Sequence, residues 1–366
     1  MKNSFLRTLY HTFVVKKYNI KTFRGGWMLT SIYVNDYKQK KASYLAIAKA
    51  HLAGWSYSDE RILGVTNANR KHYLSTRDYC SLHPFNGSYS FWIDDKLTLK
   101  YILSGTKAGK YMPEYYFQIS DNGSIIPLMD LDACYAMQGL DGIVSLLESK
   151  GTLAFKLIKS SLGVGFYRVE YNDGVYYMNG EKMNREQFMS KICSLRNYIV
   201  TEFLFPHPEI AKLCDKSVGC LRYIVGRNKK GEIQDIYSFM RFGTSKSKYV
   251  ENYNSGGVLS IIHDGKYIGG NVLDFETNTN CKIERHPDND VVLKGEIPHW
   301  DIIVQAAHEI ADVMPQLSYM GIDFCITNTD KVKVIEINSL SSLDSLQTDM
   351  SIFDTSAGVF FRERLR

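Results

Sequence analysis

Near the carboxyl end of the chain, two short runs rich in β-branched and aromatic residues flank a polar stretch. The runs are residues 321–327 and 332–338, and the stretch between them is Asn328-Thr-Asp-Lys331. This alternation of apolar run and polar turn predicts a β-hairpin. The hairpin constrains the fold strongly, because its register fixes which side chains of the two strands share a face.

The register of this hairpin would bring three polar side chains together. If the turn is centred between Thr329 and Asp330, Asp323 lies opposite Glu336, with Cβ atoms about 5 Å apart. Asn338 points to the same face, because side chains alternate along a strand. Two ionised carboxylates this close repel each other, and oxygen ligands of this kind suit Mg²⁺. A magnesium site is one interpretation, and an ordinary solvated face of a hairpin is the other.

Length and composition indicate a globular protein of two or three domains. The chain has 366 residues, 45% of them hydrophobic, and no run approaches the roughly 20 apolar residues that span a bilayer. Its first residues are interrupted by Arg7 and His11 and lack a small-residue cleavage site, which makes a poor signal peptide. The seven cysteines are scattered, without a C-x-x-C pair. They predict reduced thiols in a cytoplasm rather than a disulfide framework or a zinc knuckle.

The positive charge is concentrated at the amino terminus. Residues 1–50 contain ten Lys and Arg side chains and a single acid, Asp36, so this segment carries +9. Apolar residues recur between the charges at helical spacing: Phe5, Leu6, Leu9, Tyr10, Phe13 and Val14. A basic amphipathic helix suits an anionic membrane surface, here the inner face of the membrane. The alternative is a helix that packs on its own domain with its charges in water.

Helices are expected at both ends of the chain. Residues 1 to about 85 are expected to be mostly helical, with the clearest apolar stripe over 40–55. A further helix is expected over 301–317, with Asp301 as its N-cap.

Strands are expected in between, mostly in antiparallel pairs. Residues 258–263 and 267–273 are expected to form a hairpin around Asp264-Gly265. Other strands are expected at 152–158, 166–171, 198–204, 218–227 and 233–242. Without regular βαβ alternation, and without a G-x-G-x-x-G fingerprint, this pattern indicates the α+β class.

Lys156 lies within the apolar strand 152–158. An unpaired ammonium group in such a strand is costly unless it meets an anion. Gly163-Val-Gly165 begins seven residues later, after Ser160 and Ser161, and a loop of this kind lets backbone amides approach a phosphate. The combination suggests a phosphate clamp, and an exposed edge-strand lysine before a tight turn is the alternative.

Two arginines also lie within apolar strands. Arg222 belongs to 218–227 and Arg241 to 233–242. Guanidinium groups held on rigid strands bind phosphates and carboxylates bidentately, although strand arginines also occur on solvated faces. The glycine-ended stretch 249–257 that follows is either a substrate loop or a connector.

The motifs of this chain, taken in their order along the sequence, resemble those of ATP-grasp ligases. The order is strand lysine, glycine loop, a strand ending Val200-Thr-Glu-Phe-Leu204, then G-x-D thirteen residues before E-x-N. Within that superfamily the chain is most similar to the sugar-transfer-associated ATP-grasp proteins of polysaccharide assembly. The similarity covers roughly residues 85–350. Its segments are Val200-Thr-Glu-Phe-Leu-Phe-Pro-His-Pro-Glu-Ile-Ala211, Ser217-Val-Gly-Cys-Leu-Arg-Tyr-Ile224, Val250-Glu-Asn-Tyr-Asn-Ser-Gly-Gly257, Gly321-Ile-Asp323 and Glu336-Ile-Asn338.

The resemblance implies an ATP-grasp fold, in which two α+β subdomains clasp ATP after a basic, mostly helical region. The implied domains are 1–85, 86–204 with the lid loop and adenine hinge, and 205–366 with the metal site. The implied Mg²⁺ ligands are Asp323, Glu336 and Asn338. The implied ATP contacts are Lys96 (with Lys100 close by as an alternative), Lys156, Ser160, Gly163, Gly165, Thr201, Glu202, Phe203, Leu204 and Glu209. Arg222 and Arg241 would face the transferring phosphoryl group or the acceptor.

The resemblance also implies an activity, with ATP and Mg²⁺ as cofactors. A carboxylate would be activated as an acyl phosphate and captured by an amine, with release of ADP and phosphate. The expected acceptor is a sugar, a sugar nucleotide or a lipid-linked glycan, and no nucleic acid is expected. The alternatives are phosphorylation of a hydroxyl and a non-catalytic nucleotide-binding scaffold.

Three residues depart from the family pattern. Leu157 stands where the family lysine is usually followed by proline, Ser160 replaces a loop glycine, and Thr201 replaces the first hinge acid. These changes leave the adenine contacts and the loop geometry open, while the metal set is intact.

Overall fold

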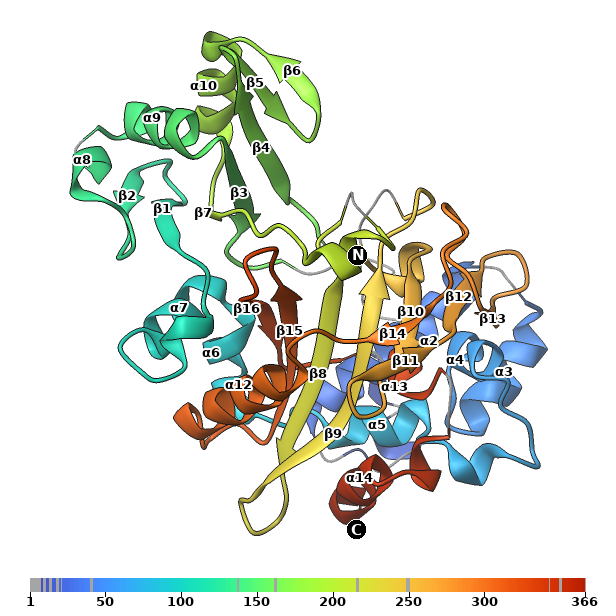
Figure 1. Cartoon of the computed structure of the whole chain (residues 1–366). Coiled ribbons are helices and arrows are strands. Elements are labelled where there is room, and N and C mark those ends of the chain that lie inside the picture. The colour runs from blue at the N-terminus through green and yellow to red at the C-terminus, as the bar shows by residue number, and fades with distance from the viewer. Residues whose placement is uncertain are drawn as a thin grey trace.

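The computed structural model describes residues 8, 11–12, 15–17, 20, 22–39, 42–136, 138–160, 163–214, 217–247, 251–341, 343–348 and 351–365. These residues form a small lobe and a large lobe, each built on a seven-stranded antiparallel sheet (Figure 1). The α+β class is confirmed. The apolar residues of the expected basic helix, from Phe5 to Val14, lie outside the described residues.

The amino-terminal region is helical, as expected. A serine precedes three of its helices, and the hydroxyls of Ser43, Ser56 and Ser75 each accept a hydrogen bond from the backbone N–H three residues later. The helix expected over 40–55 is shorter. The bounds are α2 Phe23–Gln39, α3 Tyr44–Leu52, α4 Tyr57–Ile62 and α5 Thr76–Leu82.

The small lobe projects from the rest of the molecule (Figure 1). Its sheet has the order β2-β1-β7-β3-β4-β5-β6, and helices α9 (Leu140–Lys150) and α10 (Arg185–Ser194) pack against it. Its core is apolar and aromatic, with Phe117, Phe155 and Phe188 fully buried. The strands are β1 Tyr115–Ile119, β2 Ile125–Pro127, β3 Thr152–Leu157, β4 Tyr167–Asn172, β5 Val175–Met178, β6 Glu181–Met183 and β7 Tyr198–Glu202.

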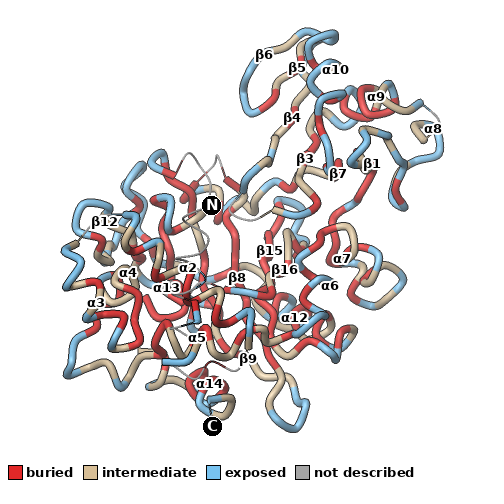
Figure 2. The backbone as a smooth tube through the Cα atoms, turned by 180° about the vertical axis from the view of Figure 1, so that it is seen from behind, coloured by how far each residue is buried: buried red, intermediate tan, exposed pale blue. Residues whose placement is uncertain are grey.

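The large sheet, of order β13-β12-β10-β9-β8-β15-β16, has a core on each face. Successive residues of β8 point into opposite cores. Tyr223 and Val225 pack with Ile303 of α12, whereas Ile224 packs with Phe360 of α14 and with the amino-terminal helices. Strands β8 and β15 are accordingly buried along most of their length (Figure 2). The bounds are β8 Cys220–Arg227, β9 Ile233–Phe242, β10 Val258–Ile261, β12 Gly270–Asp274, β13 Thr279–Ile283, β15 Tyr319–Ile326, β16 Val332–Asn338, α12 Trp300–Val313 and α14 Ala357–Leu365.

Helices α6 and α7 precede the small sheet in sequence but pack on the large lobe, where Leu99 and Leu103 join the core beneath α12. The remaining elements are short. They are α6 Phe91–Asp94, α7 Lys96–Leu103, α8 Ala133–Ala136, α11 Pro208–Ala211, α13 Leu343–Gln347, β11 Lys266–Ile268, β14 Lys294–Glu296, and the 3₁₀ turns η1 Arg70–His72, η2 Gly87–Ser90, η3 Gly109–Tyr111, η4 Tyr253–Ser255 and η5 Ile352–Asp354.

Two expectations about these elements are wrong. The strand expected at 267–273 is divided at Gly269, whose φ of +71° turns the chain, so that β11 pairs with β14 and only β12 pairs with β10. Helix α12 begins at Trp300, after His299, so Asp301 lies inside the first turn instead of capping it. Its negative charge there still suits the helix dipole. None of the described helices is both long and apolar enough to cross a bilayer.

Candidate functional site

The hairpin of β15 and β16 sets Asp323 directly opposite Glu336, as predicted. The turn itself differs from the expected one. The Thr327 N–H donates to the Lys331 carbonyl at 2.8 Å, and Asp330 adopts a left-handed φ of +57°. The strands therefore leave the turn one residue out of the expected register, and a bulge next to Asp323 restores it. The opposition of the two acids thus depends on the bulge as well as on the turn.

Asp323 is almost completely buried and is held by two arginines from neighbouring strands. Arg222, its direct partner on β8, donates from Nε to Oδ1 and from Nη2 to Oδ2, the latter at 2.7 Å. Arg241 lies 2.9 Å from Oδ2 and also reaches Sγ of Cys220 at 2.8 Å. Burial alone would raise the pKa of Asp323, but attraction to the two guanidinium groups holds it below its usual range. Asp323 is therefore a carboxylate at neutral pH.

Glu336, on the adjoining strand, faces Lys96 at the start of α7. The Lys96 Nζ lies 3.1 Å from Glu336 Oε2 and donates to the Ser160 carbonyl at 3.1 Å. Asn338 donates from Nδ2 to Glu336 Oε1 at 3.4 Å. The structure thus brings Lys96, Ser160, Glu336 and Asn338 together from three distant parts of the sequence.

Lys100, the alternative to Lys96, is occupied elsewhere. Its Nζ lies 2.5 Å from Asp130 Oδ2, donates to the Pro113 carbonyl at 2.8 Å and sits over the ring of Tyr115. These contacts tie α7 to the start of the small sheet. Of the two lysines, Lys96 is the one that faces Glu336.

Lys156 on β3 is an ammonium group whose charge is not matched. Among the described residues, no carboxylate or carbonyl lies within hydrogen-bond or ion-pair distance of it. Burial, and after it repulsion from Lys96, lowers the pKa of Lys156 to about 8, against the attraction of Glu336. Two lysines therefore share one close carboxylate, Glu336, with Glu202 as a weaker attraction on Lys156.

The glycine loop after β3 is shaped by its backbone. Gly163 and Gly165 both have φ of +72°, a conformation that other residues rarely adopt. A Cβ atom on Gly165 would lie 2.5 Å from Cδ1 of Leu157. The Ser160 carbonyl, at the loop's start, is the one bound by Lys96. Residues 161 and 162 lie outside the described residues.

The residues expected as an adenine hinge form the passage from β7 to the large lobe. Thr201 is fully buried, and Leu204 is buried too. Glu202 ends β7 and accepts a hydrogen bond from the Glu114 N–H at 3.0 Å. The ring of Phe203 packs edge-on against Phe205. Glu209, by contrast, is exposed on α11 and pairs with Lys212 at 2.5 Å.

His207 fixes the end of this passage to the large lobe. Its backbone N–H donates to the Ile326 carbonyl at 2.8 Å. Its ring Nε2 lies 3.3 Å from Asp330 Oδ1, and His299 Nε2 lies 3.3 Å from the same oxygen. These three side chains lie close enough to hold a metal ion. However, His207 Nδ1 accepts the Glu209 N–H at 3.1 Å, so in the neutral ring Nε2 carries the proton and offers no lone pair to a metal ion. The cluster is therefore a hydrogen-bonded clamp.

Two positioning contacts were missed in the sequence because their partners are far apart in the chain. Asp94 accepts hydrogen bonds from the backbone N–H and the hydroxyl of Ser339, at 3.0 and 2.7 Å, and so fixes the end of β16 beside α6. Lys333 donates to the Met112 carbonyl at 2.8 Å and lies 3.9 Å from Glu202. The only sequence signal was a charge at each position, which is too common to be informative.

The glycine-ended stretch after Arg241 brings Glu251 near Arg241. Burial raises the pKa of Glu251, against a backbone hydrogen bond and the charge of Arg241. Asn252 caps the turn η4, and Gly256 follows with φ of +100°. The start of this stretch thus contributes a further acid next to Arg241.

The donor set on the hairpin fits a hard divalent cation. Asp323, Glu336 and Asn338 present oxygen atoms from two adjacent strands, the ligand type that Mg²⁺ takes. The Asp323 carboxylate has about four acceptor positions, of which the arginines use three. Asn338 would have to turn its amide to offer its oxygen, because Nδ2 now faces Glu336.

Two antiparallel sheets joined by a hinge, with Lys156 of a strand and Lys96 of a helix near the acids of the β15–β16 hairpin, define a protein of the ATP-grasp class. Within it, the chain belongs to the sugar-transfer-associated ATP-grasp family, whose match covers residues 79–356. The resemblance inferred from the motifs is thereby confirmed. No curated protein matched the sequence.

Solved structures of ATP-grasp ligases are similar at low identity. The ATP-grasp ligase PsnB complexed with minimal precursor is 11% identical, with 76% of this chain and 62% of that chain covered and a TM-score of 0.40. D-alanyl-alanine synthetase A from Vibrio cholerae is 13% identical, with 70% and 56% covered and a TM-score of 0.36. N5-carboxyaminoimidazole ribonucleotide synthetase from Thermotoga maritima is 14% identical, with 68% covered and a TM-score of 0.33. This chain spans only 42% of the length of the Thermotoga protein.

Proposed function

We propose that the protein is a cytoplasmic, ATP-dependent carboxylate–amine ligase that works through an acyl phosphate. The observation that carries the proposal is the meeting of Lys96, Lys156 and Glu336 beside Asp323 and its two arginines. Cations outnumber the carboxylates of this site, so a polyanion such as a triphosphate would restore the balance of charge. Membership of the sugar-transfer-associated family supports the assignment.

ATP would bind between the lobes. Lys96 and Lys156 would hold the phosphates, and the loop from Ser160 to Gly165 would close over them with its backbone N–H groups. Adenine would lie at the hinge. Its contacts there are assigned to Thr201, Glu202, Phe203, Leu204 and Glu209.

Mg²⁺ on Asp323, Glu336 and Asn338 would neutralise the β- and γ-phosphates as charge develops. The protein's own part in the chemistry is positioning and electrostatic stabilisation. Arg222 and Arg241, held on rigid strands, would stabilise the phosphoryl group during transfer or orient the carboxylate substrate. Because Asp323 fixes both guanidinium groups, their positions are set before any substrate binds.

The reaction would proceed in two steps. A carboxylate oxygen of the substrate attacks the γ-phosphorus, the bond to the β-phosphate oxygen breaks, and ADP leaves. The amine then attacks the acyl carbon, phosphate leaves and the amine loses a proton, which gives an amide. Neither step needs a nucleophile from the protein. We assign the amine to a sugar, a sugar nucleotide or a lipid-linked glycan, on the strength of the family alone.

Trapping with hydroxylamine tests the proposal. The protein with Mg²⁺-ATP, a pool of carboxylates and hydroxylamine should form a hydroxamate in step with ADP release. Glu336→Gln should abolish both and leave the fold intact by circular dichroism. A stable phosphoester in place of the hydroxamate would assign the protein as a kinase of hydroxyl groups. ATP binding without turnover in any pool would assign it as a nucleotide-binding scaffold.

A further inference from the structure

The outer face of helix α3 is apolar and exposed. Tyr44, Leu45 and Leu52 are 72%, 66% and 60% exposed, although the same helix buries Ile47 and Ala50 on its inner face. Residues 45 and 52 are about two turns apart and residue 44 precedes 45, so the exposed side chains lie on one side of the helix. Single exposed apolar residues are common on protein surfaces, whereas a cluster of them marks an interaction site. The three side chains together therefore indicate a binding surface.

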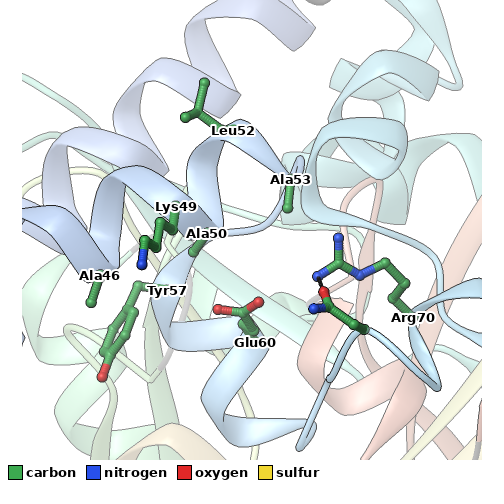
Figure 3. Close-up of a pocket in the computed structure, with 9 residues that line it drawn as sticks. Ala46, Lys49, Ala50, Leu52, Ala53, Tyr57, Glu60 and Arg70 are labelled. Atoms are coloured by element: carbon green, nitrogen blue, oxygen red, sulfur yellow. Dashed lines mark hydrogen bonds between the residues drawn. The ribbon is translucent and has the colours of Figure 1, made fainter.

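A groove runs beside this face, between α3 and the segment that follows it (Figure 3). It measures about 640 Å³, and Ala46, Ala50 and Ala53 contribute apolar surface to it. Lys49 and Arg70 add two cations to its lining, and Glu60 adds one acid. The face and the groove together make an indented apolar surface whose lining carries a net positive charge.

The charge of the amino-terminal segment to which α3 belongs is one-sided. Residues 1–50 carry ten Lys and Arg side chains and one acid, Asp36. Asp36 is buried and accepts hydrogen bonds from His51 Nε2 at 2.9 Å and from the Tyr57 N–H at 2.7 Å. The segment's only acid is thus turned inward, whereas Lys38 and Lys49 are exposed.

We propose that the exposed face of α3 docks the protein on an anionic membrane surface. Leucine and tyrosine side chains on one side of a helix, flanked by lysines, are the combination that binds at the headgroup boundary of a bilayer. The lysines keep their charges at the lipid phosphates while their stems follow the apolar surface. A second copy of the chain is disfavoured as the occupant, because two segments of charge +9 would repel each other.

The position of α3 leaves the catalytic opening free. Helix α3 lies on the side of the molecule away from the small lobe in both views (Figures 1 and 2). A protein docked through α3 would therefore hold the hinge and the glycine loop away from the lipid. The inference does not rest on the proposed ligase activity and is tested separately from it.

Sedimentation of the full chain with vesicles tests the proposal. The protein should bind vesicles of phosphatidylcholine with about a third phosphatidylglycerol, and bind pure phosphatidylcholine far more weakly. The double substitution Leu45→Glu and Leu52→Glu should reduce the partition coefficient by about tenfold or more, because it removes apolar contacts and adds like charge. Lys38→Glu with Lys49→Glu should weaken binding and flatten its dependence on salt.

A control for a single added charge is Ile268→Glu, at a position that is 78% exposed on β11, and it is compared with Leu45→Glu alone. Ile268→Glu should bind vesicles as the unchanged protein does. Circular dichroism and binding of an ATP analogue should be the same in all variants. Equal vesicle binding by the α3 variant, or no vesicle binding by the unchanged protein, would overturn the proposal. Self-association that the α3 substitutions abolish, without vesicle binding, would assign the face to a second copy instead.

Discussion

At the scale of single residues, Lys156 shows how a binding site lowers the stability of the protein that carries it. Its ammonium group is partly desolvated, lies near Lys96 and has a pKa lowered to about 8. A lysine in this state costs folding free energy until an anion arrives. The unmatched positive charge of Lys156 therefore both lowers the stability of the empty protein and favours the binding of an anion.

Lys156→Met should raise the free energy of unfolding at pH 7 by about 1–2 kcal/mol and weaken ATP binding strongly. Urea denaturation and titration with an ATP analogue measure the two effects. Lys159→Met is the matched control, because Lys159 is exposed and lies 3.6 Å from Asp95. It should change both quantities little. A loss of stability in Lys156→Met would contradict the desolvation argument.

The gain in stability from Lys156→Met should depend on pH. Below pH 8 Lys156 is protonated in both the folded and the unfolded chain, so the full penalty is present. Between pH 8 and about 10 the unfolded chain keeps the proton and the folded chain loses it, so the stability of the unchanged protein rises relative to the variant. The stability gap between the two should therefore narrow over this range.

Neutral substitutions of Asp323 and Glu336 are expected to lower the stability of the protein by different amounts. Asp323→Asn removes the charge that two buried guanidinium groups face, so it should lower the free energy of unfolding by about 3–5 kcal/mol. Glu336→Gln should cost less, about 1–3 kcal/mol, because its side chain is 22% exposed, although the change leaves buried Lys96 without its carboxylate partner, while turnover is lost. Denaturation curves and the hydroxamate assay separate the two effects. Equal loss of stability in both would show that Asp323 does not anchor the arginines.

At the scale of elements, the loop after β3 depends on a backbone that only glycine adopts readily. Gly165→Ala adds a Cβ atom 2.5 Å from Leu157 at a φ of +72°. Gly174→Ala, on the next turn, meets a similar φ of +80° but nothing within 4 Å. We expect about 1 kcal/mol of lost stability from Gly174→Ala and clearly more from Gly165→Ala, which should also raise KM for ATP. Equal costs by urea denaturation would mean that the loop yields to the added atom.

The elements also show how far sequence reasoning reaches. The hairpin at 321–338 was predictable because strand alternation and turn polarity are local, and local rules also gave the strands around Lys156, Arg222 and Arg241. The bulge beside Asp323 and the break at Gly269 were not, because both depend on pairing with strands that lie elsewhere in the chain. The opposition of Asp323 and Glu336 was therefore predicted correctly from an incorrect turn.

The same limit applies to the candidate site. Residue types and spacing were enough to single out Asp323, Glu336 and Lys156. The choice between Lys96 and Lys100 required their partners, Glu336 for the first and Asp130 for the second. The binding of both arginines to Asp323 was equally invisible in the sequence, because the three residues come from three strands of one sheet.

At the scale of the whole molecule, the two lobes are joined by the hinge, by polar contacts and by part of one hydrophobic core. The chain passes between them after Glu202, where Pro206 pairs with Thr327, and Lys96 of the large lobe reaches the Ser160 carbonyl of the small one. The small lobe has a core of its own, but its base joins the core of the large lobe beneath α12 through Tyr115, Leu128, Ile158 and Ile199. A ligand that binds Lys96 and Lys156 at once would therefore add a polar link beside the apolar contacts that already join the lobes.

Binding of a non-hydrolysable Mg²⁺-ATP analogue should accordingly slow backbone amide exchange in both lobes at once. The expected segments are 163–166 after β3 and 203–207 at the hinge, because their amides lie beside the proposed phosphate and adenine positions. Helix α3 serves as the internal reference and should exchange at an unchanged rate, since it lies far from the hinge (Figure 1). Lys156→Met should remove the protection after β3 first. Protection confined to the large lobe would contradict a nucleotide that bridges Lys96 and Lys156, and would place the binding site on the large sheet alone.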